Sequence, residues 1–302
     1  MAVASLPLAT LEALNASPLC RRNTRNEVEN TSVMTTFTHE ALLHLHGPDA
    51  AKFLQGQTTA DFLNAAPNSL LRGAFCNPKG RVLADFLAAV ISHEDIWLRS
   101  RRAVAEHLVA HLERYLMFSK ATLTLTDWAV SADSIDAENA LCLDPDQGLM
   151  VIPRGAALTE YWSAPDHTAP GRLTERAFQA QEIAIEEARI EKSTIGAYLP
   201  QDLNYDLNDA VSFKKGCYTG QEIIARLHFR GTPKRRLYSA ECSVDAELEP
   251  GAIITAADTE KTLGSVVNCA ATENGKVMLI EAVETVFEQN PRVSDAQIRA
   301  KP

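Results

Sequence analysis

The chain has 302 residues, of which 46% are hydrophobic, and a net charge of −10 at pH 7. This length and composition allow a sizeable core in one large or two to three smaller globular domains, and they exclude a fibrous or wholly disordered protein. No apolar run approaches the roughly 18 to 20 residues that span a bilayer, so a transmembrane helix is excluded. The six cysteines form no CxxC pair and no close cluster, which favours reduced thiols over a disulfide framework or a zinc or iron–sulfur cage. We therefore expect a cytoplasmic protein without a membrane partner.

Residues 1–33 differ from the rest of the chain. They lack a basic start, and Pro7 and Glu12 interrupt their apolar residues, which argues against a signal peptide. A cluster of arginines would fit a mitochondrial presequence, but three glutamates in the same segment argue against one. A mitochondrial location would follow only if the segment is such a presequence. The segment is predicted to be a disordered extension, with Met34 as the candidate natural start.

Strand-like and helical patterns alternate between Met34 and residue 232. The stretch "ALLHLHG", residues 41–47, alternates leucine with histidine as in a half-buried strand. The stretch "GPDAAKFLQG" places Pro48 at the start of a helix and Gly56 just past its end. Residues 101–118 carry apolar side chains at four-residue spacing, which predicts an amphipathic helix, and residues 121–128 alternate as a strand. Residues 34–232 are therefore predicted to mix α and β structure.

The helical period disappears after residue 232. The stretches "RRLYSAECSV" and "EPGAIITA" alternate or follow a turn as strands do, and two further strand-like runs flank Asn274-Gly275, a dipeptide favoured in tight hairpin turns. The pattern predicts a small antiparallel barrel or sandwich over residues 233–287. The polar residues 288–302 are predicted to form a frayed tail.

The segment "KKGCYTGQE", Lys214 to Glu222, carries the strongest functional signal. Thr219 and Glu222 fit a capping box, which predicts a helix that starts beside Cys217. The positive end of that helix and the neighbouring basic side chains would favour a thiolate. We therefore expect Cys217 to be more reactive than the other five cysteines.

The region around this segment is basic. Residues 211–240 contain seven lysines or arginines and one acid, Glu222, within a chain of net charge −10. Gly216 and Gly220 would let the backbone approach an anionic or planar ligand closely. The pattern fits an anion site for a carboxylate tail or for nucleic-acid phosphate, and it also fits a solvated basic edge.

The stretch "SFKKGCYTGQEIIAR" closely resembles the K-G-C-Y-x-G-Q-E signature of the YgfZ family. These are folate-binding relatives of the glycine-cleavage T-protein that support iron–sulfur cluster assembly or repair and tRNA methylthiolation. Four further stretches agree with the family in the expected order: "GPDAAKFLQGQTTAD", "CNPKGRVLADF", "RYLMFSKATL" and "YLPQDLNYD". The resemblance spans roughly residues 36–283.

The resemblance implies an α+β fold, a T-protein-like three-lobed ring with two α+β lobes from residues 34–232 and a C-terminal antiparallel β-barrel. It implies tetrahydrofolate or a derivative as cofactor, in a central channel that the signature loop borders. It assigns the functional thiol to Cys217, which would be at most a transient iron ligand and not part of a resident metal site. The folate-binding positions that it implies are Lys215, Gly216, Tyr218, Gly220, Gln221, Glu222, Arg226 and Asp85.

Three functions remain as alternatives. The T-protein has an adjacent acid pair where this chain reads Ala84-Asp85, which argues against ordinary aminomethyltransferase chemistry and leaves enzymatic activity open. The leading hypothesis is a folate-binding accessory protein for iron–sulfur (4Fe–4S) enzymes, with those enzymes or cluster-assembly proteins as partners. The alternatives are a folate-dependent one-carbon transferase that uses Asp85 and a thiol-redox sensor or scaffold without folate. Direct nucleic-acid binding is not expected of an acidic chain with few aromatics near its basic segment.

Overall fold

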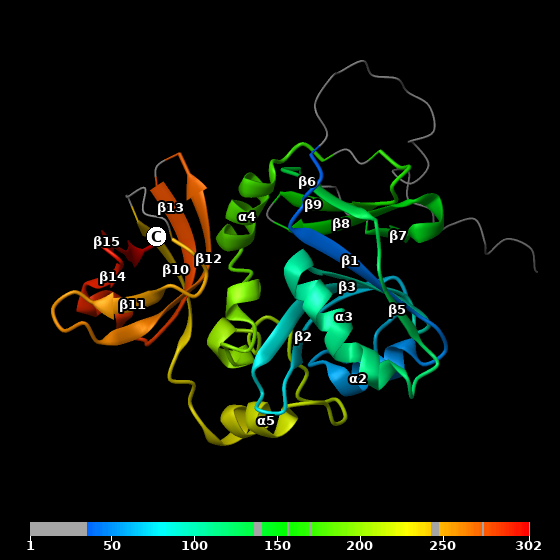
Figure 1. Cartoon of the computed structure of the whole chain (residues 1–302), viewed down its shortest axis with the longest axis horizontal. Helices are drawn as coiled ribbons and strands as arrows, with labels where there is room; N and C mark the ends of the chain where they lie inside the picture. The colour runs from blue at the N-terminus through cyan, green and yellow to red at the C-terminus, as the bar shows by residue number, and fades with distance from the viewer. Residues whose placement is uncertain are drawn as a thin grey trace, which may run out of the picture.

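The computed structural model describes residues 35–135, 141–155, 157–168, 171–242, 248–273 and 275–301 (Figure 1). The predicted extension, residues 1–33, and Asn274 of the predicted hairpin turn lie outside the described residues. The described chain forms three antiparallel sheets and four α-helices. None of those helices has the length and apolar character needed to cross a membrane.

The first lobe is a five-stranded sheet with strand order β2-β3-β4-β1-β5. Its elements are β1 Glu40–His46, α2 Ala50–Gln57, β2 Ser69–Cys76, β3 Val82–Ser92, β4 Asp95–Arg101, α3 Arg102–Leu116 and β5 Thr122–Leu125. α3 packs against β1, β3 and β5. It buries Val104, Leu108 and Leu112, the stripe that the four-residue spacing predicts.

The elements predicted in this lobe are confirmed, with one shifted boundary. In β1 the leucines are buried, but of the two histidines predicted on the exposed face only His46 is exposed and His44 is half-buried. β5 occupies the strand predicted over residues 121–128. α2 follows Pro48 as predicted, but Gly56 lies inside the helix, because the helix continues until the N–H of Thr58 bonds to the carbonyl of Leu54.

The second lobe is a four-stranded sheet with strand order β6-β9-β8-β7 and the helix α4. Its elements are β6 Ala129–Asp133, β7 Cys142–Asp144, β8 Leu149–Gly155, β9 Leu158–Ser163 and α4 Glu175–Ala184. Phe178 of α4 and Trp162 of β9 belong to one buried cluster. α4 also packs against β12 and β13 of the third sheet, so it joins this lobe to the barrel (Figure 1).

The third lobe is a seven-stranded antiparallel sheet that curls into a nearly closed barrel (Figure 1). Its strands are β10 Arg236–Cys242, β11 Ile253–Ala256, β12 Thr262–Thr272, β13 Gly275–Ala282, β14 Pro291–Val293, β15 Ala296–Gln297 and β16 Arg299–Ala300. The predicted hairpin is confirmed, since Thr272 pairs with Gly275. The frayed tail predicted for residues 288–302 is wrong, because β14 pairs with β11 and β16 pairs with β10. The α+β architecture of two lobes and a C-terminal barrel is thus confirmed.

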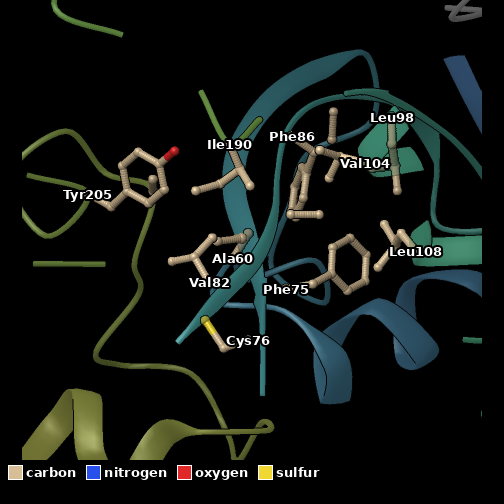
Figure 2. Packing of buried hydrophobic residues seen from close by; sticks show 14 of the residues in the cluster. Ala60, Phe75, Cys76, Val82, Phe86, Leu98, Val104, Leu108, Ile190 and Tyr205 are labelled. Carbon is tan, nitrogen blue, oxygen red and sulfur yellow. The ribbon is translucent and has the colours of Figure 1, made fainter. Parts of the chain in front are cut away.

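One buried core links the first lobe to the barrel. Phe75, Phe86, Leu98, Val104 and Leu108 pack together between the five-stranded sheet and α3 (Figure 2). The same cluster extends through the connecting segment, residues 188–205, to buried side chains of β12 and β13. The lobes therefore hold fixed positions around the segments that carry the signature.

Candidate functional site

The signature segment lies against the turn between β2 and β3. α5, Gln221–Arg230, begins directly after Gly220, whose φ is +85°. A Cβ atom at Gly220 would lie 2.5 Å from the carbonyl oxygen of Asn77 and 3.0 Å from the Cα of Gly80, so a side chain does not fit here. The fold thus brings the "CNPKGRVLADF" motif into contact with the signature.

Lys215 anchors the signature loop to the end of α2. Its ammonium donates hydrogen bonds to the carbonyls of Gln55, Thr58 and Ala60 at 2.8, 2.7 and 2.5 Å. Burial lowers the pKa of Lys215 to about 8, and Asp61 opposes that shift, so the side chain is charged at neutral pH. Carbonyls at a helix C-terminus carry partial negative charge, which suits a cation. The structure therefore gives Lys215 an anchoring role, and its contact with folate stays a prediction.

We expect Lys215→Met to lower the free energy of unfolding by about 3 kcal/mol, because three carbonyls lose a charged donor. Lys214→Met is the matched control, since the neighbouring side chain is exposed and should change stability by less than about 0.5 kcal/mol. Urea denaturation of both variants measures the difference. Equal stability of the two variants would contradict the anchoring role.

Cys217 is the exposed thiol of this loop. Of the other free cysteines in the described residues, Cys76 and Cys242 are buried and Cys269 is half-buried. Burial raises the pKa of the Cys76 thiol to about 12, which keeps it protonated at neutral pH. Cys142 is disulfide-bonded, which corrects the expectation of reduced thiols at that position. Reagents in solvent therefore reach Cys217 more readily than the other free cysteines.

Tyr218 packs on the buried side of the signature loop. Its ring is buried and lies 5.0 Å from the Nζ of Lys215, a cation–π contact. Burial, and to a smaller extent Cys76, raises the pKa of Tyr218 above its usual range. Gly216 and Cys217 are exposed between these two buried side chains. The loop is thus fixed from inside and presents its thiol to solvent.

The predicted capping box is wrong. Gly220 is the N-cap of α5, and it makes no side-chain capping bond to this helix end among the described residues. A capping box needs Thr219 at the N-cap and Glu222 at the third helical position, but α5 begins one residue too late for that pairing. Glu222 still lies in the first turn, where its charge favours the positive end of the helix dipole.

The remaining signature positions lie on α5. Gln221 is half-buried, whereas Glu222 and Arg226 are exposed. The helix is anchored through Ile224, which is buried and whose carbonyl accepts a hydrogen bond from Nε2 of Gln201 at 2.8 Å. Because Gln201 belongs to the "YLPQDLNYD" motif, three of the stretches that resemble the family meet around this helix. The polar side chains of α5 and the Cys217 thiol are accessible together.

Asp85 lies in a buried network and not beside the signature. Its carboxylate accepts hydrogen bonds from Nε of Arg189 at 2.5 Å and from the backbone N–H of Ile190 at 2.6 Å. Among the described residues, no hydrogen bond or ion pair joins Asp85 to residues 214–226. The buried ion-pair network consists of Glu40, Asp85, Arg99, Arg101, Arg154, Glu160, Glu182, Glu187 and Arg189.

Arginines hold the carboxylates of Glu182 and Glu187 in this network in their charged form. Arg99 is fully buried and donates to Glu160 at 2.9 Å and to Glu182 at 3.0 Å. Burial alone would raise the pKa of Glu187, but Arg154 and Arg99 outweigh it and hold the pKa at about 2. Removing one member of such a network leaves its partner charged and buried, which costs more than the pair contributes.

A cavity of about 200 Å³, the junction cavity, borders this network between α4, the first lobe and the barrel. Its polar lining includes His39, Arg101, Glu182, Arg189, Glu191 and Asn268. Glu191 accepts a hydrogen bond from Nε of Arg101 at 2.8 Å, and burial raises the pKa of Glu191. Asn268 bonds to the backbone of Arg189 in both directions, at 2.8 and 3.0 Å. The cavity is thus lined by both donors and acceptors, and those named here already bond to protein partners.

Sequence reasoning missed the buried ion-pair network and the junction cavity. One signal was present, because Arg99, Arg101 and Glu160 interrupt strands that are otherwise apolar or small. Charged residues in such strands are almost never buried unless they are paired. Their partners could not be identified this way, since Glu182 and Arg189 come from a helix and a loop far along the chain.

The chain is similar to known proteins in sequence. A model of the GCVT N-terminal domain matches residues 17–136. The tRNA-modifying protein YgfZ of Escherichia coli O157:H7 is 29% identical over 279 residues, which cover 82% of this chain and 83% of that protein. An uncharacterized protein of Haemophilus influenzae is 28% identical over 224 residues, which cover 74% of this chain and 78% of that protein. These matches confirm the resemblance that the signature predicts.

The fold is similar to that of a solved structure. The crystal structure of glycine cleavage system aminomethyltransferase T from Bartonella henselae superposes with a TM-score of 0.67 and covers 89% of this chain and 84% of that chain. The sequence identity is 15%, so this likeness concerns the fold. It confirms the T-protein-like arrangement of two α+β lobes and a barrel.

Proposed function

We propose that this chain, a relative of the YgfZ proteins, is a folate-binding accessory protein that supports assembly or repair of iron–sulfur (4Fe–4S) enzymes and, through them, tRNA methylthiolation. The observation that carries the proposal is the engagement of Asp85 by Arg189 and Ile190. A transferase of the T-protein kind would need a free acid there, whereas the exposed Cys217 is available for chemistry. Iron–sulfur enzymes or cluster-assembly proteins are the partners that this function requires.

The junction cavity supports binding of tetrahydrofolate or a derivative. A pterin ring presents N–H donors beside a carbonyl oxygen, and carboxylates accept from such donors while guanidinium and amide groups donate to the carbonyl. Glu191, Arg101 and Asn268 line one cavity and carry these groups, and a bound ring would share hydrogen bonds that they already make with one another and with Arg189. Its volume of about 200 Å³ is below the roughly 300 to 1,000 Å³ of sites for drug-sized ligands, so it suits the ring and not the whole cofactor. The bound folate would supply one-carbon carrier chemistry.

Cys217 supplies the soft ligand or nucleophile that the accessory function needs. Thiolates bind iron and attack electrophiles, which the hydroxyl and carboxyl groups nearby do less well. Lys215 and Tyr218 hold the loop in place, and the loop exposes the thiol to solvent. In our proposal the iron or cluster is cargo that reaches this thiol from a partner protein.

Titration of tetrahydrofolate against the purified protein tests the folate part of the proposal. We expect Glu191→Gln to weaken binding about tenfold, because a charged acceptor is lost, and Cys217→Ser to leave the affinity unchanged. Glu94→Gln, an exposed position on the turn between β3 and β4, is the matched control. Thermal unfolding of each variant checks that the fold is retained. If the unaltered protein binds no tetrahydrofolate, the redox sensor or scaffold without folate becomes the better hypothesis.

A further inference from the structure

A second hollow of about 770 Å³, the barrel groove, runs between the end of α5 and the barrel. Its charged lining consists of Arg81, Asp202, Lys234, Arg235 and Glu281. Arg81 comes from the turn that contacts the signature, and Lys234 and Arg235 come from the link between α5 and β10. The groove is therefore built partly from segments that lie beside α5.

Three cations of the barrel groove keep free donors. Lys234 is exposed, and no hydrogen bond or ion pair to another described residue engages it. Arg81 uses only Nη1, which donates to the carbonyl of Ala197 at 2.7 Å and lies 3.7 Å from the carboxylate of Asp202. Arg235 likewise uses only Nη1, which lies 3.2 Å from Glu281. The other N–H groups of both guanidinium ions have no bond to the described residues and can donate to a ligand.

The two carboxylates of the groove already have donors. Asp202 accepts from the backbone N–H of Leu199 at 2.8 Å, and Glu281 accepts from Arg235. Burial raises the pKa of both acids, and Arg235 opposes that shift at each of them. Each carboxylate is paired with one arginine of the groove, so the ammonium of Lys234 and the unbonded N–H groups of Arg81 and Arg235 are the donors that an incoming anion would meet.

The rest of the basic segment contributes less. The ammonium of Lys215 already donates to carbonyls at the end of α2. The two terminal nitrogens of Arg236 donate to the two carboxylate oxygens of Asp206 at 2.6 and 3.1 Å. The sequence also allowed residues 211–240 to be a solvated basic edge. That interpretation thus fits only part of the segment. Of the cations in residues 211–240, Lys234 and Arg235 line the barrel groove.

We propose that the barrel groove binds the γ-linked polyglutamate tail of a folate. This inference rests on the proposed folate function and adds the site of the tail. Glu191 and Pro250 line the junction cavity, while Ser193 and Gly251 line the groove, and the Ser193 hydroxyl donates to the carbonyl of Pro250 at 2.8 Å. A ligand with its ring in the cavity would therefore have the groove next to it. Cations distributed along an open groove match carboxylates repeated along a chain.

Calorimetric titration with tetrahydrofolate monoglutamate and pentaglutamate tests this site. We expect the pentaglutamate to bind at least about tenfold tighter at low salt, with the gain shrinking as salt screens the exposed charges. Lys234→Ala should cut the affinity for the pentaglutamate about fivefold and leave the affinity for the monoglutamate within about twofold. Lys120→Ala removes the same charge from an exposed position on the first lobe and should change neither affinity.

Three outcomes separate this inference from the proposed function. If both folates bind equally at all salt concentrations, the tail site is wrong and the folate function stands. If neither folate binds but a pterin-free γ-glutamate pentapeptide binds in a Lys234-dependent way, the groove is upheld as a carboxylate site and the folate function fails. If inorganic polyphosphate or a single-stranded oligonucleotide binds through Lys234 and the glutamate peptide does not, the tail assignment is overturned in favour of phosphate recognition.

Discussion

Cys217→Ser is expected to abolish support of iron–sulfur enzymes in cells that lack the native factor. The serine hydroxyl occupies nearly the same space as the exposed thiol, so the fold and folate binding should persist. A hydroxyl is a much poorer nucleophile at neutral pH and does not ligate iron as a soft thiolate does. Activity of a 4Fe–4S enzyme and the extent of tRNA methylthiolation in complemented cells measure the effect, which should fall to the level of cells without the factor.

The control for this experiment lies in the same loop. Lys214→Met changes an exposed side chain three residues away without touching the thiol, so it should complement fully. Expression of soluble protein and its unfolding temperature should match between the two variants. Full complementation by Cys217→Ser would show that the signature acts without its thiol, and the accessory function proposed here would then lose its chemical basis.

Asp85→Asn is expected to lower the free energy of unfolding by about 3 kcal/mol. The asparagine keeps the size of the side chain but leaves Arg189 and its neighbours in the buried ion-pair network with one negative charge fewer. Asp95→Asn is the matched control, because Asp95 pairs with His44 at a partly exposed position and should contribute less than about 1 kcal/mol. Urea denaturation at neutral pH measures both variants.

This comparison also separates the accessory protein from a transferase. Loss of cellular function in Asp85→Asn should follow the loss of folded protein, and it should recover when the variant is stabilised or expressed at low temperature. A variant with unchanged stability and no cellular function would mean that Asp85 acts in chemistry. The one-carbon transferase would then be the better description, and the engagement of Asp85 by Arg189 would be only its resting state.

The sequence by itself determined the local elements and the position of the signature. The alternation of residues 41–47 and the four-residue stripe of residues 101–118 predict β1 and α3, because periodicity depends on neighbours along the chain. The Asn274-Gly275 dipeptide predicts the pairing of β12 with β13 for the same reason. The motif around Cys217 identified the resemblance that the comparisons confirm.

Only the tertiary structure decided what the charged residues of the candidate site do. Lys215 bonds to the end of α2 and Asp85 to Arg189, and neither partner is near in sequence. The same is true of the strands of residues 291–300, which are two or three residues long and carry no readable alternation until they pair with β10 and β11. Local patterns report which face of an element is apolar, whereas the partner of a buried charge is set by the packing of distant segments.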